Sequence, residues 1–170
     1  YSQVLSSGYA FDTAKEWEIA YGQISRLDGS IPYSVVRGNH DNEAYFEQYF
    51  NNDSYKSQLS GFYSDSSVLN AYSKFEVGSE KYLLLLLDDN PTNSVIEWAS
   101  DVISANSDYR VIINTHTYIS YKGELIDHNI PEMAYAVGEL NKGKDGISET
   151  DDEYENDGKE LWDKLVSKHE

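Results

Sequence analysis

An unbroken run of five leucines at residues 83–87 constrains the fold of this chain more than any other segment. A strand with one solvent-facing side alternates between apolar and polar residues, and this run does not. Residues 71–77 precede it across a short turn that contains Gly78 and Ser79, and this arrangement predicts a β-hairpin. We expect the leucine arm to be covered on both faces, which requires a layered fold.

The predicted helices and strands alternate along the chain, which favours an α/β fold. Four segments place apolar residues at the intervals of a helix, and three of them begin with a capping-box pair. These helices are predicted for residues 13–27 and for segments that begin near residues 42, 94 and 157. Strands are predicted at 33–37 and 109–113, and loops at 51–67 and 117–156. Because no internal repeat is present, we predict one domain over residues 1–170.

The composition restricts the partners of the chain. Thirteen Lys and Arg residues against 30 Asp and Glu residues give a formal net charge of −17, which opposes binding to nucleic acid or to anionic membranes. A phosphate-bearing ligand would therefore need positive charge from metal ions or from a few placed side chains. The chain has no Cys, which excludes thiolate metal sites. No apolar run approaches the roughly 20 residues that span a bilayer. The many Tyr, Ser, Asn and Asp residues suit an extracellular or bacterial cell-surface protein.

Two predicted strands end in a motif that contains histidine. The sequence Gly-Asn-His-Asp occupies residues 38–41, and Asn-Thr-His occupies residues 114–116. An Asn side-chain oxygen and a neutral imidazole are both ligands for divalent ions, and a second imidazole can donate a proton to a leaving alkoxide. Each motif alone has a simpler interpretation, as a turn or as a hydrogen-bonded histidine at the edge of the core. In α/β folds, however, ligands bind beyond the carboxyl ends of strands. We therefore expect Asn39, His40 and His116 to lie close together.

Residues 32–41, Pro-Tyr-Ser-Val-Val-Arg-Gly-Asn-His-Asp, resemble a segment of calcineurin-like metallophosphoesterases in which a strand runs into Gly-Asn-His-Asp/Glu. The order of later segments is also similar to that family. Residues 83–88 resemble its buried strand, and residues 111–116 resemble its strand that ends in a metal-binding histidine. Residues 156–169 resemble the helix before its last metal motif. The resemblance implies a layered α/β/β/α sandwich.

Carried over by position, the resemblance implies that Asn39 and His116 are metal ligands and that His40 is the general acid near the leaving group. It implies that Asp12 orients His40, although Asp12 could equally cap the following helix. Residues 88–90 receive no metal role and are interpreted as a turn before the next helix. The implied activity is hydrolysis of a phosphomonoester or phosphodiester at a centre of two divalent ions, Mn, Fe or Zn.

The chain departs from the family pattern at both ends. The first family motif, Asp-x-His, has no counterpart. The family's Gly-Asp-x-x-Asp is matched by Gly-Tyr-Ala-Phe-Asp at residues 8–12, so Tyr9 stands where the bridging carboxylate belongs. A phenol with a pKa of about 10 is a poor substitute for that carboxylate. The last motif, Gly-His-x-His, is also missing, and His169 is interpreted as a helix-end residue.

Two interpretations of these departures remain open. Either the chain is the central part of a phosphoesterase domain, incomplete at both ends, or it is a degenerate relative. A start without Met and an end just before an expected strand favour the incomplete domain, which as it stands is expected to bind metal weakly or not at all and to be inactive. Tyr9 favours degeneration, and with it a non-catalytic phosphoesterase-like binding module of a secreted multidomain protein. In that alternative, exposed tyrosines would form a surface for sugars or peptides.

Overall fold

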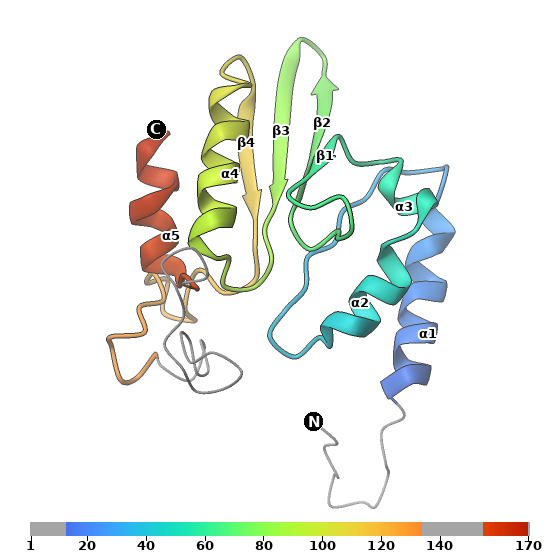
Figure 1. Ribbon diagram of the computed structural model, residues 1–170, viewed down its shortest axis with the longest axis horizontal. Coiled ribbons are helices and arrows are strands. Elements are labelled where there is room, and N and C mark those ends of the chain that lie inside the picture. Colours follow the sequence, from blue (N-terminus) through green and yellow to red (C-terminus); the bar gives the residue numbers. More distant parts are fainter. Residues whose placement is uncertain (1–12, 134–154, 170) are drawn as a thin grey trace, which may run out of the picture.

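The computed structural model describes residues 13–133 and 155–169 (Figure 1). The predictions for Tyr9 and Asp12 fall outside these residues. The described part is a mixed α/β fold with one four-stranded sheet in the order β1-β2-β3-β4. The predicted α/β class is therefore confirmed. The second β layer of the predicted sandwich is not found within 13–133 and 155–169.

The centre of the sheet is the predicted hairpin. Strand β2 (Ala71–Val77) pairs antiparallel with β3 (Glu80–Leu86), and Gly78 in the turn adopts a positive φ of 65°. Strand β4 (Arg110–Asn114) runs parallel to β3, and the short β1 (Gly61–Phe62) pairs antiparallel with β2. The carboxyl ends of β3 and β4 therefore lie at the same edge of the sheet.

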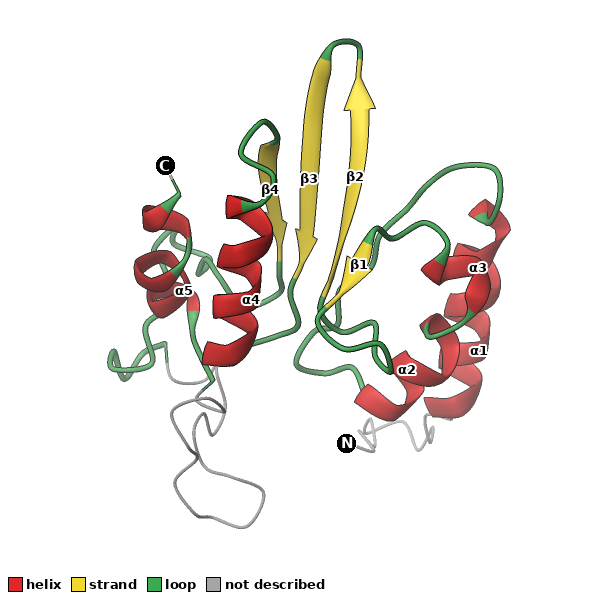
Figure 2. Ribbon diagram, turned by 45° about the horizontal axis from the view of Figure 1, so that its top comes forward, coloured by secondary structure: helices red, strands yellow, loops and turns green. Residues whose placement is uncertain are grey.

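Two helices cover one face of the sheet (Figure 2). Leu83, Leu85 and Leu87 are fully buried against α4 (Asn93–Ser104) and α5 (Gly158–Lys164). The capping box predicted for α5 is present, whereas α4 is capped by Thr92 and not by the predicted residue at position 94. A 3₁₀ turn, η4 (Val166–Lys168), follows α5.

The opposite face of the sheet is only partly covered. Leu86 is buried, but its neighbour on that face, Leu84, is half-buried. Phe75 and Ile112 on the same face are 40% and 42% exposed. The prediction of a leucine arm covered on both faces is thus wrong for part of its length, because the described residues provide a layer of helices on one side only.

A second core of aromatic residues lies beside β1. It is built by α1 (Thr13–Ile24) with the 3₁₀ turn η1 (Ser25–Leu27), by α2 (Glu43–Phe50) and by α3 (Asp53–Lys56). Trp17 of α1 stacks on two tyrosines of α2, and its ring is nearly parallel to that of Tyr49, at 6°. Helix α3 falls inside the predicted loop 51–67. It begins because the side chain of Asn52 accepts a hydrogen bond from the backbone N–H of Tyr55.

Residues 33–37 do not form the predicted strand. They have no regular secondary structure and pair with no described strand, and side chains form hydrogen bonds to their backbone instead. The N–H of Tyr33 donates to Gln58 Oε1 at 3.1 Å. The N–H of Val35 donates to the Tyr55 hydroxyl at 3.1 Å, and that hydroxyl donates to the Val35 carbonyl at 3.4 Å. Tyr55 therefore takes the place of a neighbouring strand for the segment that leads into Gly-Asn-His-Asp.

Replacing Tyr55 with Phe tests this arrangement. We expect a loss of about 1 kcal/mol in the free energy of unfolding at pH 7, because the Val35 N–H loses its partner.

Burial raises the pKa of Tyr55 to about 12, above the value of about 10 in an unfolded chain. The native state then holds the proton to higher pH, so the free energy of unfolding of the wild type falls between about pH 10 and 12. Urea denaturation across this range should show a smaller fall for Tyr55→Phe. Tyr121→Phe, at a residue that is 84% exposed, is the control, and an equal fall in all three proteins would contradict the prediction.

Candidate functional site

Three segments meet beyond the carboxyl ends of β3 and β4. They are the turn at residues 38–41, the residues that follow β3, and the residues that follow β4. Asn39 Oδ1 and His116 Nε2 lie 3.2 Å apart, and the Thr115 hydroxyl donates to the backbone carbonyl of Asp88 at 3.2 Å. The prediction that Asn39 and His116 converge is therefore confirmed. His40 lies on the same turn with an exposed side chain.

The Gly-Asn-His-Asp turn is closed by its own last residue. The N–H of Asp41 donates to the Gly38 carbonyl, and the N–H of Gly38 donates to Asp41 Oδ2, both at 2.9 Å. Gly38 is buried, and a Cβ atom there would lie 3.1 Å from three atoms of the His116 ring. Glycine at this position thus allows the imidazole to lie against the turn. The sequence indicates the turn but not this close contact, which depends on a residue 78 positions later.

An ion pair that the sequence analysis missed lies just behind the turn. Arg37 Nε donates to Asp88 Oδ1 at 2.9 Å, and Arg37 Nη2 donates to Asp88 Oδ2 at 2.7 Å. The side chains are 18% and 13% exposed. Burial raises the pKa of Asp88, against the opposing effect of the Arg37 hydrogen bond. Burial also acts to lower the pKa of Arg37, but the hydrogen bond and charge of Asp88 outweigh it and the pKa is raised. Asp88 is therefore a partner of Arg37 and more than a turn residue.

Asn39 Oδ1 accepts a hydrogen bond from the His116 Nε2–H, and with the ring proton on Nδ1 instead the same two atoms could hold one divalent ion. Two ligands about 2.1 Å from a metal at a right angle lie about 3.0 Å apart, close to the observed 3.2 Å. Both side chains are exposed, so a cation can approach them from solvent. Two donors are too few to hold a divalent ion tightly, because such sites use four to six ligands. Weak metal binding by this chain therefore remains our prediction.

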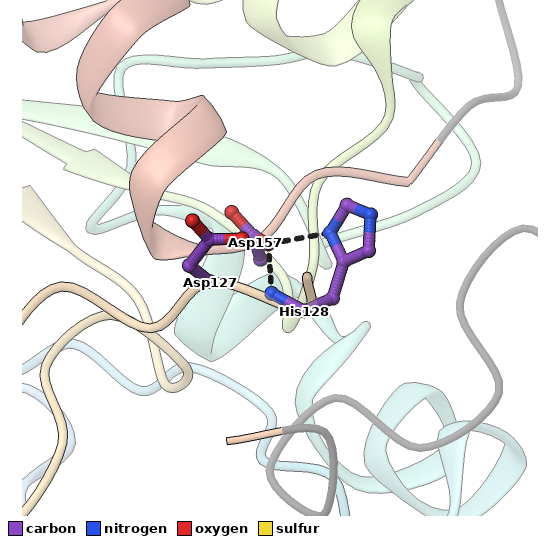
Figure 3. Close-up of side chains that lie close together, drawn as sticks. All are labelled: Asp127, His128 and Asp157. Atoms are coloured by element: carbon purple, nitrogen blue, oxygen red, sulfur yellow. Dashed lines mark hydrogen bonds and ion pairs between the residues drawn. The ribbon is translucent and has the colours of Figure 1, made fainter. Parts of the chain in front are cut away.

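A second cluster of potential metal ligands lies at the start of α5 (Figure 3). One ligand atom from each of Asp127, His128 and Asp157 lies within 4.8 Å of the others. His128 donates to Asp157 Oδ2 from its backbone N–H at 2.7 Å, and its Nδ1 lies 2.6 Å from the same oxygen. The other Asp157 oxygen accepts from the N–H of Glu160 at 2.9 Å. Both oxygens of the buried Asp157 thus bind protein groups, and we interpret the cluster as a helix cap that fixes a loop.

The remaining predicted features do not form a competing site. His169 lies at the end of η4, where its Nε2 is 2.8 Å from the Ser100 hydroxyl, as its interpretation as a helix-end residue requires. The part of the chain that the structure describes shows no surface of exposed tyrosines. Among the tyrosines in the described part of the chain, Tyr63 and Tyr121 are exposed, and the others are buried or half-buried.

No helix among the described residues is long and apolar enough to cross a membrane. Comparisons of the chain with protein-family models, with curated proteins and with solved structures found no match. The function is therefore inferred from the contacts at the ends of β3 and β4 together with the sequence motifs that form them.

Proposed function

We propose that this chain forms part of a metal-dependent phosphoesterase with a layered α/β/β/α domain, which hydrolyses a phosphomonoester or phosphodiester at a centre of two divalent ions. The observation that supports this proposal is the 3.2 Å approach of Asn39 Oδ1 to His116 Nε2. The two residues are 77 positions apart and come from the two motifs that resemble the metallophosphoesterase family. The contact brings the two motifs together at the edge of the sheet where β3 and β4 end.

In this proposal Asn39 and His116 hold one of the ions. Two divalent ions held there would supply activation of a water nucleophile and neutralisation of the charge on the phosphoryl oxygens. Cations are needed because the chain carries a net charge of −17 and because the nearest basic side chain along the chain, Arg37, is bound to Asp88. His40, exposed beside Asn39, is placed to give a proton to the leaving alkoxide. The non-catalytic alternative rests on Tyr9, which lies outside the described residues, and the tyrosines that are exposed in the described part of the chain are Tyr63 and Tyr121.

The experiment uses the full-length protein that the gene encodes. Metal content after exposure to Mn²⁺, Zn²⁺ or Fe²⁺ is measured first, and hydrolysis of 4-nitrophenyl phosphate and of bis(4-nitrophenyl) phosphate is measured next. We expect two bound ions and hydrolysis of at least one ester. A folded, metal-loaded protein that hydrolyses neither ester would contradict the proposal.

Replacing His116 with Ala should lower the metal affinity by more than about tenfold, because changes even to residues that support metal ligands have effects of that size. Calorimetric titration with Mn²⁺ measures the change. His169→Ala is the matched control, because its imidazole contacts Ser100 and not the turn. Equal affinity in His116→Ala and in the wild type would remove His116 from the site.

A further inference from the structure

We propose that Arg37 and Asp88 are positioning residues that set the separation of Asn39 and His116. The expected effect on metal binding and catalysis rests on the proposed function, whereas the effect on the distance between Asn39 and His116 does not. The guanidinium donates two parallel hydrogen bonds to the carboxylate, at 2.9 and 2.7 Å. This arrangement fixes both the distance and the orientation of the two side chains.

The ion pair connects all three segments of the site. Arg37 directly precedes the turn, and its Nη1 also donates to the carbonyl of Asp41 at the end of the turn, at 3.4 Å. Asp88 directly follows the last leucine of the buried run. Its carbonyl accepts from Thr115, the residue before His116, at 3.2 Å. Its N–H donates to Asn70 Oδ1 at 2.9 Å. A displacement of Arg37 would therefore move Asn39 relative to His116.

The energetics of the pair favour a role in geometry over a role in stability. Both side chains are more than four-fifths buried. Taking two charges out of water carries a desolvation penalty that can exceed their mutual attraction. Buried ion pairs of this kind are often replaceable by apolar residues without loss of stability. An apolar pair could not supply the two directed hydrogen bonds, hereafter the fork, that Arg37 donates to Asp88.

The guanidinium of Arg37 is also bound to protein oxygens. Its Nε and Nη2 donate to the Asp88 carboxylate, and its Nη1 donates to the carbonyl of Asp41. A guanidinium surrounded in this way is not available to clamp a substrate phosphate. Loss of the fork should therefore change metal affinity and kcat, whereas loss of a phosphate clamp would change KM.

The first test is made without metal or substrate. In the metal-free protein, labelled for NMR, the side-chain amide of Asn39 should show a cross-peak to the ring protons of His116. Arg37→Lys keeps the charge but cannot form the fork, and we expect the cross-peak to weaken or disappear. Arg110→Lys is the matched control, because Arg110 forms an exposed pair with Glu80 at the other end of the sheet. An unchanged cross-peak in Arg37→Lys would overturn the proposal.

The second test measures function in the metal-loaded protein. Arg37→Lys should lower Mn²⁺ affinity by about 10–100-fold, the range seen when a group that orients metal ligands is lost, while KM for the ester stays the same. A rise in KM with unchanged metal affinity would instead assign Arg37 to the phosphate and overturn the proposal. If Arg37→Lys does not fold, Thr115→Val is tested in its place. We expect this variant also to bind Mn²⁺ more weakly than the wild type. Unchanged Mn²⁺ affinity in Thr115→Val would count against the proposal. Loss of the NMR cross-peak in a protein whose wild type hydrolyses no ester would support the positioning role and reject the proposed function.

Discussion

His40→Ala is expected to lower kcat for phenyl phosphate by a factor of about 10²–10⁴ in the metal-loaded protein, the range that general acid catalysis contributes. Metal affinity should not change, because in the proposed site Asn39 and His116 are the ligands and the turn that holds Asn39 is closed by Asp41 and Gly38. Steady-state kinetics and calorimetric titration with Mn²⁺ measure the two quantities separately.

The leaving group distinguishes a proton donor from a residue that merely shapes the turn. An alkoxide or phenoxide of high pKa needs a proton more than 4-nitrophenoxide does, so the loss in His40→Ala should be larger for phenyl phosphate than for 4-nitrophenyl phosphate. His128→Ala is the control, because its ring lies against Asp157 at the start of α5. An equal loss for both esters would show that His40 does not protonate the leaving group.

Gly158→Ala is expected to lower the free energy of unfolding by about 3 kcal/mol, at the upper end of the usual cost of overpacking. A Cβ atom at this position would lie 2.2 Å from the carbonyl oxygen of Tyr118. That oxygen belongs to the backbone, so it cannot move aside as a flexible side chain would. Helix α5 would have to shift, together with Leu161, which is 1% exposed in the main core.

Urea denaturation measures this loss, and Gly22→Ala provides the matched control. Gly22 lies in α1, and a Cβ atom there would have no neighbour within 4 Å. Because alanine favours a helix over glycine by about 0.5–1 kcal/mol, the control should be as stable as the wild type or more so. A Gly158→Ala protein with wild-type stability would show that α5 does not pack closely on residue 118.

The sequence predicts those parts of the fold that depend on local patterns. The hairpin follows from the turn at Gly78 and the leucine run, and the start of α5 follows from its capping box. The strand predicted at 33–37 fails because strands need a partner, and the segment is bound instead by the side chains of Tyr55 and Gln58. No local pattern could indicate that these two side chains would satisfy its backbone.

The candidate site also has one part that local sequence patterns predict and one part that they do not. Asn39 and His116 stand in recognisable motifs at predicted strand ends, so their proximity could be predicted. The fork between Arg37 and Asp88 joins residues 51 positions apart, and it depends on how closely the turn approaches the end of β3. A carboxylate directly after a buried strand was the available signal for Asp88. This signal did not identify Arg37 as the partner of Asp88, because several basic residues could have formed an ion pair with that carboxylate.

The position of β4 has a practical consequence for all these measurements. It forms the edge of the sheet in the described residues, and Val111 and Ile112 on it are 37% and 42% exposed. An open edge with apolar side chains can add a strand from a neighbouring molecule and so begin aggregation. Arg110 places a charge at one end of that edge, which opposes stacking of further copies there. Metal-binding titrations therefore need dilute samples. The molecular mass should be checked by light scattering before a change in signal is attributed to metal binding.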